Sequence, residues 1–222
     1  MAKTVTHQDL KSYFGSEDHL EVSQQKSFSQ IIFELLSEKE PSKDQLNIFE
    51  LILNLSIDHG SDTPSAQKVI EEARKGETIS EAVAEGIEQI NDSHGGAGEN
   101  LMKILYQLKS DNITAEQLVS QKLQAEERLP GFGHRIYKEE DPRAKLILDK
   151  LREVSLGTEY LDLAKNLERE LNIQSGKKLP LNIDGAIAVV LCSFGWEPIL
   201  GKAVFLIART PGLVGQYLNT AK

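Results

Sequence analysis

Four short polar segments interrupt an otherwise apolar sequence, and they carry most of the side chains that could do chemistry. They comprise residues 57–65, 91–99, 130–143 and 181–185. Three of the five histidines, His59, His94 and His134, lie in these segments, each next to a glycine. Glycine allows a ligand to approach the backbone closely, and an imidazole can donate or accept a hydrogen bond near neutral pH. Because sites are often built on loops held by rigid elements, these segments are the candidate functional regions.

The third segment combines a glycine-rich backbone with positive charge. His134 and Arg135 follow two glycines, and Lys138 and Arg143 come shortly afterwards. The whole chain has a formal net charge of −9, so this local group of cations differs in sign from its surroundings. The pattern predicts an anion-binding loop, which a helix N-terminus at this place would reinforce.

Simpler interpretations exist for the other segments. His59 beside glycine is typical of a helix end, His94 of a turn, and Asp184 of an N-cap for the helix expected after it. Three histidines and an aspartate could also bind zinc, but no two of these histidines have helical i, i+3 or i, i+4 spacing, and Cys192 lies in an apolar stretch. We therefore expect no metal. The sequence also lacks a P-loop, a dinucleotide-binding glycine motif and a Gly-x-Ser-x-Gly nucleophile elbow.

The stretches between these segments have helical periodicity. Apolar residues after Ser27 recur at i, i+3, i+4, i+7 and i+8, which is one face of a helix, and Ser42 and Gln45 form a capping box before the next helix. Thr114 and Gln117 predict a second capping box, and Ser80 is the expected cap of the helix that carries Val83, Ile87 and Ile90. The remaining helices are expected at about residues 44–57, 64–75, 142–155, 158–173, 186–194 and 199–208. Only residues 178–183 resemble a strand, so the predicted fold class is all-α.

Composition limits the classes of partner. The chain has 222 residues, 40% of them hydrophobic, and a pI of about 5.2, which argues against nucleic acid or an anionic membrane as a partner. Cys192 is the only cysteine, which fits a reducing compartment. The first residues lack the apolar core of a signal peptide, and no apolar run approaches the roughly 20 residues of a membrane span. We expect a soluble, cytoplasmic protein.

Taken in order, the four segments resemble the motifs of the citrate synthase superfamily. The most specific is Pro-Gly-Phe-Gly-His-Arg-Ile-Tyr-Lys at residues 130–138, followed by Asp-Pro-Arg-Ala at 141–144. His59-Gly, His94-Gly-Gly-Ala and Asn-Ile-Asp184 accompany it, and the resemblance extends from about residue 28 to about residue 217.

Within this superfamily the sequence is most similar to citryl-CoA lyase and to the corresponding domain of ATP-citrate lyase. Gly98-Glu99 stands where typical synthases have Asn-Glu, and Gly185-Ala186 stands where they have Phe-Tyr. Residues 207–214 are also lyase-like. The resemblance implies cleavage of citryl-CoA to acetyl-CoA and oxaloacetate, by reversible Claisen-type chemistry.

The resemblance also implies a role for each matching residue. His94 would hydrogen-bond the thioester carbonyl, Asp184 would move the proton at the acetyl methyl carbon, and His134 would bond the carbonyl or hydroxyl oxygen of the four-carbon unit. Carboxylates would be held by His59, Arg143 and Arg209. Coenzyme A, present as the acyl-CoA substrate, would lie along the backbone of residues 130–134 with two cations nearby. The residues expected to contact it are Pro130, Gly131, Phe132, Gly133, Arg135 and Lys138.

The family's architecture implies two helical lobes with the substrates between them. The large lobe would comprise residues 1–96 and 196–222, and the small lobe residues 97–195. A homodimer or a higher homo-oligomer is expected, with the apolar helices around residues 46–55 and 101–108 available for an interface or for the core. The chain is short beside full-length synthases, and it ends at Lys222 without a match to the arginine that synthases supply to a neighbouring subunit. This difference argues against strong citrate binding and is consistent with a truncated, a lyase-only or an impaired enzyme.

Two alternatives to the lyase follow from the same residues. One is citrate synthase, which adds hydrolysis of the thioester, or a methylcitrate synthase, since one methylene changes discrimination by only about 1–3 kcal/mol. The other is a non-catalytic subunit that binds coenzyme A or citrate.

Overall fold

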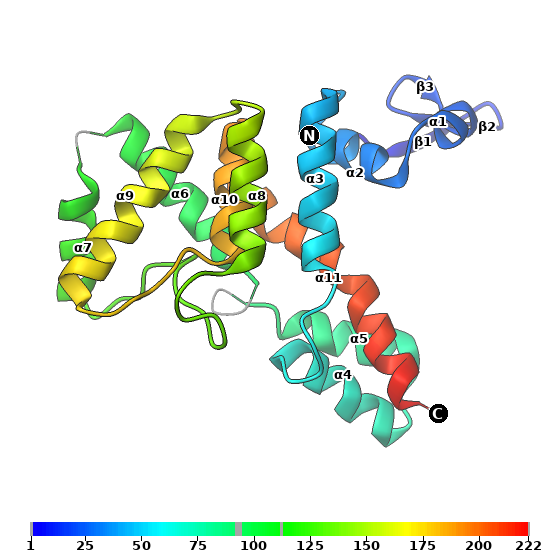
Figure 1. Ribbon diagram of the computed structural model, residues 1–222. Coiled ribbons are helices and arrows are strands. Elements are labelled where there is room, and N and C mark those ends of the chain that lie inside the picture. Colours follow the sequence, from blue (N-terminus) through cyan, green and yellow to red (C-terminus); the bar gives the residue numbers. More distant parts are fainter. Residues whose placement is uncertain (1, 92–94, 112, 222) are drawn as a thin grey trace. The chain divides into compact units, whose positions relative to one another are not determined.

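The computed structural model describes residues 2–91, 95–111 and 113–221. Helices dominate these ranges, which confirms the predicted fold class (Figure 1). The helices are α1 (His19–Gln25), α2 (Phe28–Ser37), α3 (Lys43–Ser56), α4 (Pro64–Lys75), α5 (Ile79–Glu88), α6 (Ala97–Ser110), α7 (Ala115–Gln124), α8 (Pro142–Glu153), α9 (Thr158–Ser175), α10 (Ile183–Ser193) and α11 (Ile199–Thr220). None of the helices in the described ranges is long and apolar enough to cross a bilayer.

A small antiparallel sheet near the N-terminus was not predicted. Strands β1 (Val5–Gln8), β2 (Lys11–Phe14) and β3 (Glu17–Asp18) pair in the order β1-β2-β3. All of β1 is exposed, so the strand lacks the alternation of apolar and polar residues that marks a half-buried strand. The turn between β1 and β2 uses Asp9 and Leu10 at φ +49° and +66°, without the glycine that normally signals such a hairpin.

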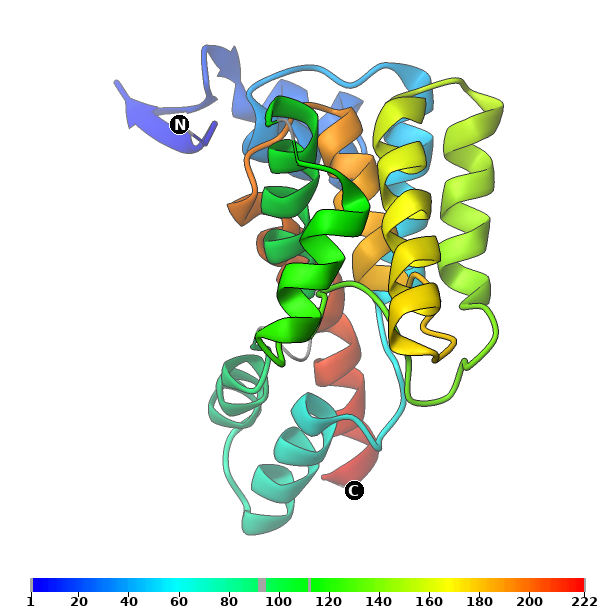
Figure 2. The same ribbon diagram turned by 90° about the vertical axis from the view of Figure 1, so that its left-hand side faces the viewer.

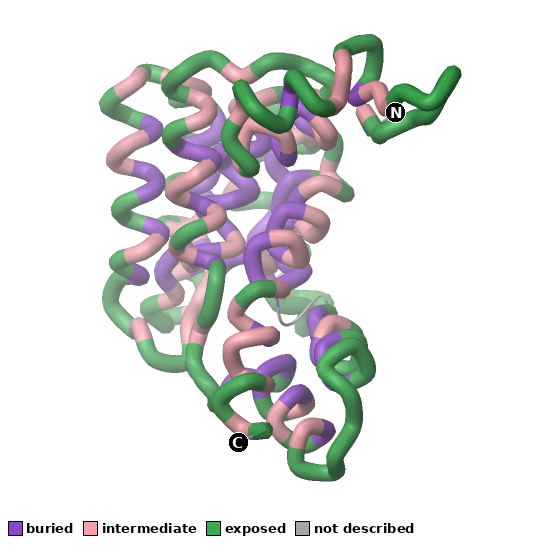
Figure 3. The backbone as a smooth tube through the Cα atoms, turned by 90° about the vertical axis from the view of Figure 1, so that its right-hand side faces the viewer, coloured by how far each residue is buried: buried purple, intermediate pink, exposed green. Residues whose placement is uncertain are grey.

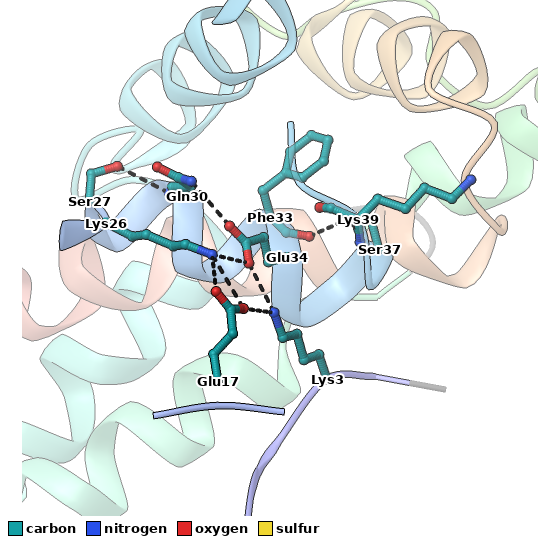
Figure 4. A network of polar contacts seen from close by, with 9 residues as sticks. All are labelled: Lys3, Glu17, Lys26, Ser27, Gln30, Phe33, Glu34, Ser37 and Lys39. Atoms are coloured by element: carbon teal, nitrogen blue, oxygen red, sulfur yellow. Dashed lines mark hydrogen bonds and ion pairs between the residues drawn. The ribbon is translucent and has the colours of Figure 1, made fainter. Parts of the chain in front are cut away.

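The chain divides into two compact units, residues 1–51 and residues 52–222, with the division inside α3. In the first unit, the carboxylate of Glu34 on α2 is buried, at 2% exposure, and accepts hydrogen bonds from Lys3 at 3.1 Å and Lys26 at 2.9 Å (Figure 4). Gln30 donates to its other oxygen, and Glu17 completes the network by accepting from Lys3. A buried carboxylate is stable only when it is paired. The network also connects α2 to the N-terminal segment, to β3 and to the end of α1, and so holds these parts together.

In the second unit, one group of helices is formed by α4, α5 and the C-terminal part of α11 (Figures 1 and 2). Their shared apolar cluster consists of Ala66, Val69, Ala82, Val83 and Leu213. Helix α11 therefore continues to Thr220, beyond its predicted end near residue 208, although Pro211 lies inside it. Burial of Leu213 compensates for the backbone hydrogen bond that proline removes.

The remaining helices of this unit pack around α10. Nearly every residue of α10 is buried, and it packs against α6, α8 and α9, while α7 packs against α9. Figure 3 shows buried positions on the helix faces that pack together and mostly exposed positions on the connecting segments. Because α10 is enclosed, the residues of its first turn are held rigidly.

Helix caps agree with the sequence in most places. Ser27, the Ser42-Gln45 box and the Thr114-Gln117 box are confirmed, and Gly76 ends α4 after its predicted last residue, Lys75. Two predictions were wrong: Thr78 caps α5 where Ser80 was expected, and Asn182 caps α10 where Asp184 was the cap candidate. In both cases the helix begins before the apolar residues from which its start was predicted, at Ile79 in α5 and at Ile183 in α10. The division into lobes 1–96 with 196–222 and 97–195 stays a prediction.

Candidate active site

The loop of residues 130–138 is fixed against the start of α10. The backbone N–H of Gly133 donates to Pro180 at 2.8 Å, and that of Asn182 donates to Gly131 at 3.0 Å. The Asn182 side chain also donates to the Gly133 carbonyl at 2.9 Å. Gly131 and Gly133 have φ values of +82° and +77°, which favour glycine. The strand-like stretch at 178–183 contributes only an isolated bridge, between Phe132 and Leu181.

Gly185 permits this close approach. A Cβ atom at Gly185 would lie 2.5 Å from the Gly131 carbonyl oxygen and 2.5 Å from the Leu181 side chain. Gly185 therefore allows the loop to pack closely on α10.

Three predicted site residues lie in direct contact: His59, His134 and Arg143. The Nε2 atoms of the two imidazoles are 3.2 Å apart. Arg143 Nη1 lies 2.9 Å from His59 Nδ1, and Arg143 Nη2 lies 3.2 Å from His134 Nε2. Residues separated by up to 84 positions thus form one cluster of two imidazoles and a guanidinium, called the donor cluster below.

The backbone determines which nitrogen of His134 carries the proton. Its Nδ1 atom accepts from the N–H groups of Ile136 at 3.1 Å and Tyr137 at 3.0 Å, so the neutral ring carries its hydrogen on Nε2. The Tyr137 ring stacks on His134 with centroids 4.8 Å apart and an interplanar angle of 21°, which fixes the orientation of the imidazole.

The donor cluster contains more N–H donors than acceptors. The His134 Nε2–H group, the free N–H groups of Arg143 and one N–H of His59 converge, whereas only the other nitrogen of His59 can accept. Burial, and then the charge of Arg143, lower the pKa of His59 to about 4 and also lower the pKa of His134. Both rings are therefore neutral near pH 7. Such a cluster suits a ligand that brings several acceptor oxygens, as a carboxylate or a keto acid does.

Asp141 supports the cluster, and the sequence analysis included it in a motif without giving it a role. Its side chain is fully buried, and it caps α8. Oδ1 accepts from the Nε of Arg143 at 3.0 Å and Oδ2 accepts from Nη2 at 2.8 Å. Burial alone would raise the pKa of Asp141, but the hydrogen bonds and charge of Arg143 hold it below its usual value. Besides its place in the motif, the sequence signal was an aspartate before Pro142, a position typical of an N-cap.

Asp184 lies in the first turn of α10 and is partly buried. Burial raises its pKa to about 6, against the opposing charges of Arg209 and Arg143. No donor within the described ranges hydrogen-bonds its carboxylate. A carboxyl group with this pKa can take up and release a proton near neutral pH.

Arg209 is a buried residue of α11. It is 3% exposed, its Nε donates to the Ser56 carbonyl at 2.9 Å, and its guanidinium lies 4.7 Å from the centre of the Phe205 ring. Gly95 lies against the same ring, since a Cβ atom there would be 2.2 Å from Phe205. The charge of Arg209 acts both on Asp184 and on His59 of the donor cluster.

Two predicted residues within the described ranges, Arg135 and Lys138, do not contact the donor cluster through their side chains. Arg135 pairs with Asp62 at 2.6 Å, and Lys138 donates to the His134 carbonyl at 3.0 Å, so both cations sit at the exposed side of the loop. The prediction for His94 lies outside the described residues. Across the described ranges, no group of three or more His, Cys, Asp or Glu side chains is placed to hold a metal.

The family follows from a comparison of the whole sequence. The profile described as "Citrate synthase, C-terminal domain" matches residues 2–222. The chain belongs to the citrate synthase family. The predicted resemblance is thereby confirmed.

Solved and curated members of the citrate synthase family differ in how much of their length the chain covers. Citryl-CoA lyase from Hydrogenobacter thermophilus is 32% identical, with a TM-score of 0.91, and the match covers 100% of this chain and 87% of that one. Citrate synthase from Thermotoga maritima shares the fold at 21% identity, with a TM-score of 0.77, covering 88% of this chain and 54% of that one. "Citrate synthase 2" of Bacillus subtilis is 30% identical over 188 residues, 83% of this chain and 50% of that protein. The chain spans about half the length of the curated citrate synthases it matches.

Proposed function

We propose that the chain is a citryl-CoA lyase, which cleaves citryl-CoA to acetyl-CoA and oxaloacetate. The observation that carries the proposal is the donor cluster of His59, His134 and Arg143, supported on the same framework as a carboxyl group whose pKa is about 6. The cluster suits the oxygens of a hydroxy or keto acid. Asp184 supplies the proton exchange that a thioester α-carbon requires.

The proposed reaction has two steps, cleavage of a carbon–carbon bond and protonation of the resulting enolate. During cleavage the hydroxyl proton of citryl-CoA passes to water, the alkoxide oxygen becomes the ketone of oxaloacetate, and the electrons of the broken carbon–carbon bond move to the thioester as an enolate. The His134 Nε2–H group would hydrogen-bond this oxygen, and the guanidinium of Arg143 would hold a neighbouring carboxylate. Asp184 would then give a proton to the enolate carbon, and in the condensation direction it would remove that proton.

The other predicted residues take supporting roles in the proposal. His59 and Arg209 would hold carboxylates, and His94 would stabilise the enolate oxygen. Coenzyme A would follow the backbone of residues 130–134, with Arg135 and Lys138 beside its phosphates. Binding of the phosphates requires Arg135 to exchange its present partner, Asp62, for the ligand.

Local sequence favours a lyase over a synthase. The chain is 32% identical to a citryl-CoA lyase, with a TM-score of 0.91. Gly185 at the end of the acidic motif is needed for the contact with Gly131, so the lyase-like residue is built into the packing. Citrate synthase remains the second candidate, because the curated relatives carry that name.

Turnover with separate detection of two products tests the proposal. The purified protein is mixed with citryl-CoA, oxaloacetate is detected through malate dehydrogenase and NADH, and free coenzyme A is detected with a thiol reagent. Oxaloacetate release without free thiol supports the lyase. Thiol release from acetyl-CoA and oxaloacetate assigns citrate synthase, and propionyl-CoA in the same assay identifies a methylcitrate synthase. Binding of coenzyme A without either reaction would leave a non-catalytic subunit.

Assembly and location complete the proposal. We expect a cytoplasmic homodimer or higher homo-oligomer, which light scattering after size exclusion would test.

A further inference from the structure

We infer that Asp141 is a positioning residue, which sets both the direction of the Arg143 guanidinium and the position of the helix turn that carries Asp184. The inference rests on the proposed function, but it concerns a residue to which that function gives no role. Asp141 is fully buried and contacts two separate helices through four hydrogen bonds.

The first effect is on the guanidinium. Asp141 accepts from Nε and Nη2 of Arg143, at 3.0 and 2.8 Å, and so occupies one edge of the planar group. The remaining N–H groups of Nη1 and Nη2 are directed toward His59 and His134, at 2.9 and 3.2 Å. Because a guanidinium presents its donors in a rigid plane, fixing one edge also fixes the fork left for a ligand carboxylate.

The second effect is on α10. Oδ2 of Asp141 also accepts from the backbone N–H of Ile183 at 3.2 Å. Ile183 begins α10 and directly precedes Asp184. One carboxylate oxygen therefore joins the guanidinium of α8 to the turn of α10, so that the substrate-binding arginine and the proton-transferring carboxyl are held relative to each other.

The third effect is electrostatic. The charged groups that act on Asp184 are Arg209 from α11 and Arg143 and Asp141 from the start of α8. The negative charge of Asp141 opposes ionisation of Asp184, whereas the two arginines favour it. A neutral residue at position 141 should therefore lower the pKa of Asp184.

Asp141→Asn is the main test, because asparagine has the same shape but can accept with only one atom. Its amide nitrogen is a donor and would face the donors of Arg143 or Ile183. The variant should therefore lose the hydrogen bonds that link Arg143 of α8 to the first turn of α10. The expected result is a fall of about a hundredfold in kcat/KM, as displaced catalytic groups typically cause. In addition, the pH limb assigned to Asp184 should move to lower pH.

Two variants make the result specific. Asp149→Asn is the same change on the same helix, at an exposed residue that pairs with Lys145 at 2.6 Å, and it should behave as wild type. Asp141→Glu keeps the charge and should recover the pH limb, even if the longer side chain lowers kcat. A loss of thermal stability in Asp141→Asn with an unchanged pH limb and unchanged KM would overturn the inference and leave a purely structural role.

A readout without turnover separates this inference from the proposed function. The exchange rate of the Arg143 Nε–H proton, measured by NMR, should be slow in wild type and at least tenfold faster in Asp141→Asn. If wild type shows that protection but does not cleave citryl-CoA, the lyase proposal fails and the positioning of Arg143 stands. If wild type cleaves citryl-CoA and Asp141→Asn keeps the slow exchange and the wild-type KM, the inference fails and the lyase proposal stands.

Discussion

The Nε2 atoms of His59 and His134 lie 3.2 Å apart. The backbone N–H groups keep the hydrogen of His134 on Nε2. If the Nε2 of His59 accepts from it, the Nδ1–H of His59 faces the N–H of Arg143. If the Nδ1 of His59 accepts from Arg143 instead, the Nε2–H groups of the two histidines face each other. Either arrangement places two donors against each other. The donor cluster thus has more donors than its own acceptors can satisfy, which suits an oxygen-rich ligand.

The first prediction follows from this imbalance. Citrate and oxaloacetate should raise the melting temperature, because a ligand at a hundred times its Kd adds about 2.7 kcal/mol to the free energy of unfolding. Differential scanning fluorimetry measures the shift. Propane-1,2,3-tricarboxylate lacks the hydroxyl that His134 would bond, and it should stabilise less than citrate. Equal shifts with both compounds would contradict the assigned position of the hydroxyl.

The second prediction concerns Asp184→Asn. Removing a general acid–base group should lower turnover by about 10²–10⁴-fold. Exchange of the acetyl-CoA methyl protons in D2O, followed by NMR, should be lost in parallel. Since burial disfavours the charged form of Asp184, the variant should melt at the same temperature as wild type or higher. Retained proton exchange in the variant would remove Asp184 from the mechanism.

The third prediction is a pH limb near 6 that is shared by the two directions. Condensation needs the ionised Asp184, whose pKa is about 6, so its kcat/KM should fall as the pH drops below about 6. Because the overall reaction takes up no net proton, kcat/KM for cleavage should show the same limb. His59, with a pKa of about 4, stays neutral across this range and adds no limb. Steady-state kcat/KM from pH 5 to 8 in both directions tests this, and a constant kcat/KM for condensation between pH 7 and 5 would refute it.

The fourth prediction compares two glycines in helices. Gly185→Ala should destabilise the protein by about 1–3 kcal/mol, the usual cost of overpacking, because its Cβ would lie 2.5 Å from the Gly131 carbonyl. Gly215→Ala in α11 meets nothing within 4 Å and should gain up to about 1 kcal/mol from helix propensity. Urea unfolding measures both. If Gly185→Ala unfolds at the wild-type urea concentration, the loop does not depend on close contact with α10.

The sequence determined the family and the helices. The loop of residues 130–138 is specific enough to indicate the family, and apolar residues at helical spacing indicated most helices, because both signals depend on neighbours within a few positions. The same local rules failed where packing decided the outcome. Helix α11 continues past Pro211 because Leu213 is buried in a cluster with α4 and α5. The strand β1 escaped notice because both of its faces are exposed.

Only the tertiary structure decided how the candidate site is arranged. The sequence indicated His59, His134 and Arg143 as separate candidate residues. Their contacts with one another join positions up to 84 residues apart and are seen only in the folded chain. The proton position on His134, the pKa of about 6 at Asp184 and the link from Asp141 to Ile183 all arise from burial and from hydrogen bonds between distant segments. These properties depend on solvent exclusion and on geometry in three dimensions, which the order of residues along the chain does not specify directly.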